Sequence, residues 1–188
     1  MAVDVSLLRA YTNGSVSVTA YGDASITLPT NASAALSADF AEVGAVTDAG
    51  ITESTSQEWN DIYIWQANLL ARRVPGKYGK TFKFAAAETN LTVLGIQFTG
   101  STITQTAEGV TIEEKVPGTD TRSWVLHGID GTRAQRIVIP SGEVTERGDV
   151  VWAAENITVY EWTLTAYPDS NLVVAYRYYL DASLDTAS

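Results

Sequence analysis

His127 is the only histidine in the chain, so acid–base chemistry that depends on histidine would have to use this residue. Asp130 follows three positions later, and a histidine–carboxylate pair is part of the machinery of nucleophilic hydrolysis. A nucleophile must complete such a pair, but the sequence has no Gly-x-Ser-x-Gly pattern. We therefore interpret His127 as a residue at the end of a strand, beside a turn at Asp130-Gly131.

Two further patterns could carry chemistry, and neither is complete. Gly79-Lys80-Thr81 matches the end of a phosphate-binding loop, but that motif has a glycine five residues earlier, where this chain has Val74. The motif also leads into a helix, whereas the residues after Thr81 predict a strand. The Glu113-Glu114 doublet cannot act as one carboxylate site, because neighbouring residues of a strand point to opposite faces. We therefore expect no catalytic site.

Composition excludes several other classes of site. The chain has no cysteine, which rules out disulfides, thiol nucleophiles and cysteine-based zinc sites. With a single histidine as well, we expect no metal and no cofactor. The formal net charge is −10, so the sequence lacks the basic footprint of a nucleic-acid binding protein. No apolar run approaches the roughly 18–20 residues of a membrane helix, and no basic leader precedes an apolar stretch, so we expect an intracellular protein without a membrane segment.

The elements that position these residues are mainly β-strands. Hydrophobic residues make up 45% and charged residues 18% of the chain, which is enough apolar material for a core. Alternating patterns predict a hairpin of residues 6–11 and 15–20 around an Asn13-Gly14 turn. Further strands are predicted at 43–46, 51–54, 61–66, 81–85, 103–106, 110–116, 123–130, 133–139, 158–167 and 172–179, with turns that include Ser141-Gly142 and Pro168-Asp169.

One helix is predicted over about 86–98, because apolar residues recur at helical spacing from Ala87 to Phe98. Many strands with one helix in the middle of the chain indicate a β-sandwich or a partial barrel that this helix flanks. The predicted fold class is therefore mainly β.

One stretch combines aromatic and charged residues as protein–protein interfaces do. Its aromatic side chains lie beside the acidic Glu58 and Asp61, and a basic cluster with no acidic member follows. The candidate interface residues are Trp59, Tyr63, Trp65, Arg72, Arg73, Lys77 and Lys80.

Several segments share their order and spacing with a known family. They are Glu42 to Ser54, Asp61 to Gln66, Thr81 to Phe84 with the helix containing Glu88-Thr89-Asn90, Trp124 to Gly131, and Thr163 to Pro168. Together they resemble the major tail tube proteins of long-tailed, siphophage-type bacteriophages, notably those of phages of actinobacteria. Many relatives carry an additional C-terminal immunoglobulin-like domain, which we do not expect here because the chain stops soon after Tyr179.

The resemblance implies a single domain over 1–188 with a structural role in the virion. Six copies would close into a ring, and rings would stack into a tube whose acidic lumen lets DNA slide through without specific binding. The implied partners are further copies and other tail proteins, namely the tape measure, terminator and distal tail proteins. The implied location is the virion tail, after synthesis in the cytoplasm of the host bacterium.

Two segments are expected to make the contacts between copies: an N-terminal arm of about 1–12 and an extended loop of about 54–80. We expect the basic residues of this loop to meet carboxylates on a neighbour, so charge reversal at Arg72 and Arg73 should impair assembly. Two alternatives stay open. One is another ring protein of phage tails or of secretion systems, of the distal tail or inner-tube type. The other is a carbohydrate-binding β-sandwich that uses exposed aromatic residues.

Overall fold

The computed structural model describes residues 4–184, so the first three residues of the expected N-terminal arm lie outside the described residues. The main sheet consists of β1 (Asn13–Ala20), β2 (Ala41–Glu42), β3 (Thr52–Tyr63), β4 (Leu70–Ala86), β7 (Thr121–Asp130), β8 (Arg133–Arg147), β9 (Tyr160–Tyr167) and β10 (Tyr176–Leu180). A second, two-stranded sheet consists of β5 (Thr102–Thr106) and β6 (Gly109–Glu113). The helical elements are α1 (Leu91–Gln97) and the 3-10 turns η1 (Val5–Leu7), η2 (Gln66–Asn68) and η3 (Ala182–Leu184).

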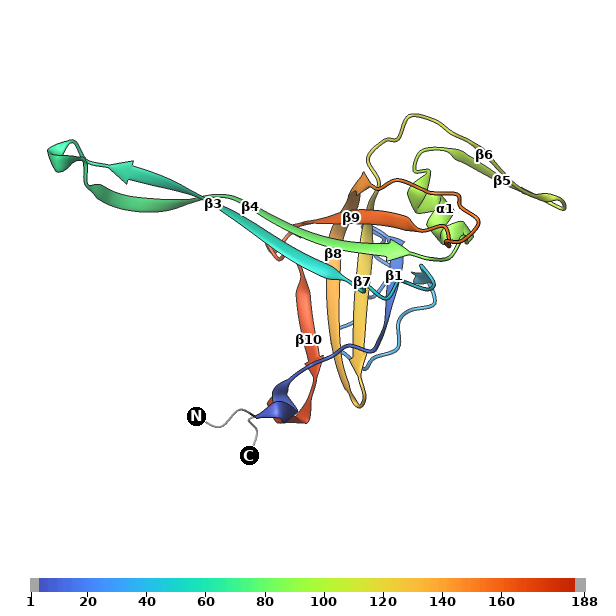
Figure 1. Ribbon diagram of the computed structural model, residues 1–188, viewed down its shortest axis with the longest axis horizontal. Coiled ribbons are helices and arrows are strands. Elements are labelled where there is room, and N and C mark those ends of the chain that lie inside the picture. Colours follow the sequence, from blue (N-terminus) through green and yellow to red (C-terminus); the bar gives the residue numbers. More distant parts are fainter. Residues whose placement is uncertain (1–3, 185–188) are drawn as a thin grey trace.

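All strand pairs of the main sheet are antiparallel, in the order β2-β1-β7-β8-β9-β4-β3, with β10 added along β8. Within the described residues β2 and β3 end this order and do not pair with each other, so the sheet is not a closed barrel. The expected mainly β fold with a flanking helix is confirmed. Figure 1 shows a body of curved strands from which the β3–β4 hairpin projects on one side and the smaller β5–β6 hairpin on the other.

Large apolar side chains alternate along the central strands and meet in one core. In β9, for example, Tyr160, Trp162, Leu164 and Ala166 are buried while the residues between them are more exposed, which is the period of two expected for a strand. Phe84 of β4 packs edge-on against two tryptophans, with ring centroids 6.2 Å from Trp124 and 5.8 Å from Trp162. Such aromatic pairs add to the free energy gained by burial.

The helix is shorter than the sequence pattern predicts. β4 continues to Ala86, which pairs with Tyr160 of β9, so the start of the predicted 86–98 helix was wrong. Helix α1 begins after Asn90, whose side chain accepts a hydrogen bond from the Val93 amide at 2.9 Å. This N-cap satisfies one of the free amides of the first turn, and it fixes where the helix can start. Val93 and Ile96 then bury the inner face of α1 in the core.

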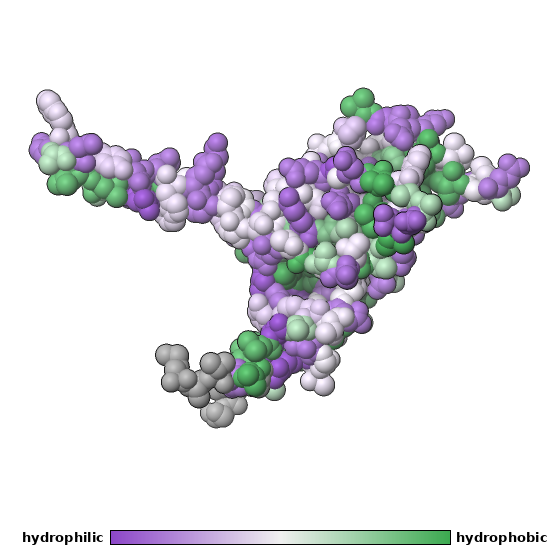
Figure 2. Space-filling model, viewed as in Figure 1, coloured by the Kyte–Doolittle hydropathy of each residue, from purple (hydrophilic) through white to green (hydrophobic). Residues whose placement is uncertain are grey.

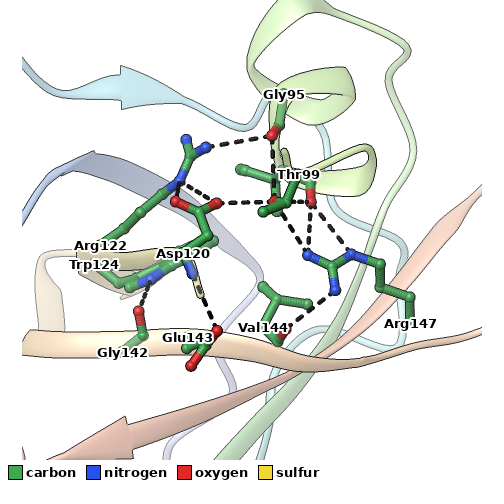
Figure 3. A network of polar contacts seen from close by, with 10 residues as sticks. Gly95, Thr99, Asp120, Arg122, Trp124, Gly142, Glu143, Val144 and Arg147 are labelled. Carbon is green, nitrogen blue, oxygen red and sulfur yellow. Dashed lines mark hydrogen bonds and ion pairs between the residues drawn. The ribbon is translucent and has the colours of Figure 1, made fainter. Parts of the chain in front are cut away.

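A polar network joins the C-terminal end of α1 to the sheet (Figure 3). Arg147 of β8 donates to the Ile96 carbonyl at 2.9 Å and to Thr99 Oγ1 at 3.2 Å. Thr99 Oγ1 in turn donates to Asp120 Oδ2 at 2.9 Å, and Arg122 bonds both that carboxylate and the Gly95 carbonyl. Carbonyls at a helix end have no partner inside the helix, so these arginines satisfy them and hold α1 in place.

The predicted hairpin at the start of the chain is wrong. Asn13 and Gly14 are not a turn but the first residues of β1, which pairs with β7 and β2. Gly14 lies opposite Gly128, and a Cβ added to Gly14 would lie 2.5 Å from the His127 carbonyl oxygen. The glycine therefore allows two strands to approach closely, a role that a short sequence pattern does not separate from a turn.

The predicted turn at Ser141-Gly142 is also wrong, because β8 runs through it. Along one side, β8 pairs first with β10, up to Val138, and then with β9, from Ser141. Pro140 lies between these partners, where the pairing with β7 also shifts register. Proline lacks an amide hydrogen, so it suits the position where β8 changes its neighbour.

Candidate subunit interface

The predicted 54–80 loop is a two-stranded hairpin. β4 pairs with β9 only from Lys80 to Ala86, whereas its pairing with β3 continues from Lys83 out to Leu70. Beyond Lys80 the two strands therefore form a ribbon that leaves the sheet, as Figure 1 shows. Two register shifts in this ribbon, one after Gln57 and one after Ile62, bend it locally.

One face of the ribbon carries a group of exposed aromatic and apolar side chains, with the Asp61–Arg73 ion pair among them. Glu53 pairs with Phe82, so odd-numbered residues of β3 share the face that Phe82 turns toward the core. The exposed apolar residues on this face are Trp59, Tyr63, Leu70 and Tyr78. Figure 2 shows hydrophobic residues gathered along one side of the outer hairpin. No other element of the described chain covers this face of the ribbon. Exposed aromatic side chains of this kind are typical of protein–protein interfaces.

The tip of the hairpin carries the most exposed tryptophan. β3 ends at Tyr63, so Trp65 lies in the turn and not in a strand as the sequence predicted. The turn is closed by a hydrogen bond from the Ile64 amide to the Leu69 carbonyl at 2.9 Å. Trp65 is 94% exposed, and Ile64 and Leu69 beside it are exposed as well.

The four candidate basic residues divide into two groups. Arg73 forms a bidentate pair with Asp61, with Nε–Oδ1 at 2.6 Å and Nη2–Oδ2 at 2.9 Å. Lys80 pairs with Glu53, which also accepts from Arg177. Arg72 and Lys77 have no ion-pair partner among residues 4–184, the part of the chain that is described. Two of the four cations are thus already paired within the chain, and two remain available to another molecule.

The internal pairs change the acidity of their carboxylates. Hydrogen bonds from Arg73 lower the pKa of Asp61 below its ordinary value. Burial acts to raise the pKa of Glu53, but hydrogen bonds from Arg177 and Lys80 outweigh it and lower that pKa overall. Both carboxylates therefore stay ionised at neutral pH, which keeps the base and the middle of the hairpin held by charge-assisted bonds.

The N-terminal arm is attached to the body where it is described. Arg9 pairs with Asp181, which also lies 3.4 Å from Arg133. Tyr11 donates its hydroxyl hydrogen bond to Gln135 at 2.5 Å, and the Thr12 amide bonds the Ile129 carbonyl at 3.0 Å. The arm thus packs on the β7–β8 turn and on the segment after β10.

One exposed apolar loop, residues 148–159 between β8 and β9, was not predicted from the sequence. Trp152 in this loop is 88% exposed, and Val151 and Ile157 are exposed beside it. The sequence signal was three large apolar residues in a segment without strand or helix periodicity.

The residues weighed for catalysis do not form a site. His127 Nδ1 accepts a hydrogen bond from Arg136 Nε at 3.2 Å, and burial together with this cation lowers the pKa of His127. Lys80 lies inside β4 and not before a helix. Among residues 4–184, no group of three or more histidine or acidic residues is placed to hold a metal ion, and no helix is long and apolar enough to cross a membrane.

Comparison with known proteins identifies the family of the chain. No curated protein sequence matches the chain. A family model described as phage tail tube protein matches residues 1–187, which is nearly the whole sequence. The chain therefore belongs to the phage tail tube protein family, and its role is that of a structural component of the tail.

Proposed function

We propose that the chain is a single tail tube domain whose copies polymerise as stacked rings of six to form the conduit for DNA ejection. The observation that carries this proposal is the β3–β4 hairpin. It leaves its own sheet at Lys80 and exposes aromatic side chains from Trp59 to Trp65. A two-stranded ribbon is marginally stable alone in water, so a neighbouring molecule that covers its apolar face would stabilise it.

Free sheet edges support association between copies. β3 and β10 each pair along one side only among the described residues, and β3 is twelve residues long. Unpaired edge strands bind other chains readily, and ring closure would satisfy their amides and carbonyls. The candidate contact residues are those of the hairpin, with Arg72 and Lys77 directed to carboxylates of a neighbour.

The charge of the protein suits a passage for DNA. A net charge of −10 in each copy would repel phosphates, so DNA would not adhere to the wall of a tube made of this protein. We further propose that the tube joins the tape measure, terminator and distal tail proteins in the virion tail, after synthesis in the bacterial cytoplasm. We infer no enzymatic activity, because His127 is bonded to a cation and not to an activated nucleophile.

Electron microscopy of the purified full chain tests the proposal. Long tubes with six copies per ring are expected, whereas isolated rings would favour a distal tail type of protein. A protein that stays monomeric at high concentration would contradict the proposal. Arg72→Glu should reduce tube formation strongly, and Arg72→Lys, which keeps the charge, is the matched control.

A further inference from the structure

The loop of residues 148–159 is a second apolar surface that is separate from the hairpin. Val151, Trp152 and Ile157 are exposed, whereas Val150 at its start packs against the core. The loop is anchored where it begins, because the Gly148 amide donates to the Glu161 carbonyl at 2.8 Å. Three large apolar side chains within seven residues form a patch that binding to another surface would bury.

The charges of this loop are opposite to those of the two hairpin cations that have no ion-pair partner among the described residues. Asp149 and Glu155 flank the apolar residues, and neither has an ion-pair partner in the described chain. On the hairpin, the cations without such a partner are Arg72 and Lys77. Each surface therefore combines exposed aromatic or aliphatic groups with charges that lack an ion-pair partner among residues 4–184, which are negative on the loop and, apart from Glu58 of β3, positive on the hairpin. Complementary charge around an apolar centre favours pairing of these two surfaces.

The two surfaces lie at opposite ends of the same strands. β4 leaves the sheet toward the hairpin at Lys80, opposite Ala166, and ends at Ala86, opposite Tyr160. The loop immediately precedes Tyr160, so it lies at the far end of β4, beside α1, as Figure 1 shows. A hairpin that extends away from this end cannot bend back to its own loop. Contact between the two surfaces requires a second copy.

We propose that the 148–159 loop is the docking surface for the hairpin tip of a second copy, with Trp65 packed on Trp152 and with Arg72 and Lys77 facing Asp149 and Glu155. The inference rests on the proposed function and names the surface that the hairpin meets. Two different patches at opposite ends of one chain make a heterologous contact, which repeats from copy to copy and so builds a ring or a filament. Tryptophan and arginine are the residues that most often carry the binding free energy of such contacts.

Charge exchange tests the pairing. One variant carries Asp149→Lys and Glu155→Lys, a second carries Arg72→Glu and Lys77→Glu, and a third carries all four changes. Each of the first two should raise the protein concentration needed for tube formation by about tenfold, and the third should restore it. All four substituted residues are exposed and lie on a strand or in a loop, so circular dichroism should report an unchanged fold.

The outcomes separate this inference from the proposed function. A defect in the hairpin variant with a normal loop variant would leave the hairpin as a contact and overturn its pairing with the loop. Normal tube formation by both variants would overturn the pairing and leave the proposed function standing, whereas a wild-type chain that forms no tubes would contradict the proposed function itself. If both double variants are defective and the fourfold variant does not recover tube formation, the pairing would also be overturned.

Cross-linking provides a second test, because the chain has no cysteine of its own. With Gln66→Cys at the hairpin tip and Ala153→Cys in the loop, oxidation of tubes should give a ladder of covalent multimers on a denaturing gel. Ala107→Cys, in the turn between β5 and β6, replaces Ala153→Cys in the matched control and should give no ladder. Tubes of the first variant that yield no ladder would overturn the inference.

Discussion

Arg177 on β10 donates a hydrogen bond to Glu53 on β3, with Nη2 2.6 Å from Oε1, although 124 residues separate them in the sequence. β10 pairs with β8 and β3 pairs with β4, so this bond joins strands that are not neighbours in the sheet. Lys80 contacts the same carboxylate from the base of the hairpin. Glu53 therefore fixes the point where the hairpin leaves the body, and it ties that point to the C-terminal strand.

Arg177→Met should lower the free energy of unfolding by about 0.5–1 kcal/mol, the range of partly exposed ion pairs. The folded state has a lowered Glu53 pKa, so the bond contributes stability above the unfolded value of about 4.3 and loses it as pH falls through the folded value. The difference in unfolding free energy between wild type and variant should therefore be largest at neutral pH and disappear in acid. Denaturant unfolding at several pH values measures it, with Glu53→Gln as the control that lacks the titration.

Variants of the Asp61–Arg73 pair test whether Arg73 of the hairpin makes its contact within one chain or between two chains. Arg73→Asp should weaken tube formation, because it places two carboxylates side by side in the ribbon. The exchange Asp61→Arg with Arg73→Asp restores the pair in the opposite direction and should recover assembly, as seen by electron microscopy. Persistent failure of the exchanged variant would show that Arg73 meets a carboxylate of another copy instead.

The sequence predicted the fold class because hydrophobic periodicity is local. The alternation along residues 160–167 and 123–130 identifies strands without knowledge of their partners. Two predictions were wrong because the features concerned depend on which strands lie next to each other. Gly14 is a glycine because β7 approaches it, and the turn predicted near Ser141 is absent because β8 changes neighbour there. Such pairings join residues far apart in the chain, and no local pattern records them.

The candidate interface could be predicted only as a list of residue types. The sequence placed aromatic and basic residues in one segment, but strand register decides which of them share a face. It also could not show that Arg73 and Lys80 are paired within the chain, because Glu53 and Asp61 reach them only after β3 folds back on β4. Trp152 was missed since exposure of a tryptophan is a property of the packed structure.

His127 should make the protein less stable in mild acid. Its pKa is lowered by burial and then by the Arg136 cation, so the folded state favours the neutral ring. Stability is therefore full above the unfolded pKa of about 6.5 and falls as pH drops through the lower folded value. The thermal midpoint of the wild type should fall between about pH 7 and pH 5 more than that of His127→Gln. Equal pH profiles would contradict this role.

Arg147 should stabilise the docking of α1. Its guanidinium donates to the Ile96 carbonyl, to Thr99 Oγ1 and to the Val144 carbonyl, so Arg147→Met removes the bonds that join the end of α1 to β8 and leaves the Ile96 carbonyl with its bond from Thr99 Oγ1. We expect a loss of about 1–3 kcal/mol in unfolding free energy, measured by chemical denaturation. Arg133→Met, at the opposite end of β8, is the matched control for removing an arginine and should cost less. Faster amide exchange confined to α1 would locate the effect.

Two glycines should respond to alanine in opposite directions. A Cβ at Gly14 would lie 2.5 Å from the His127 carbonyl oxygen, so Gly14→Ala forces β1 away from β7 and should destabilise the protein by about 1–3 kcal/mol. Gly95 lies within α1, and a Cβ there meets nothing within 4 Å. Gly95→Ala should therefore stabilise by about 0.5–1 kcal/mol, because alanine loses less backbone entropy in a helix. Thermal unfolding of both variants measures the contrast, and a stable Gly14→Ala protein would show that the two strands can separate there without loss of pairing.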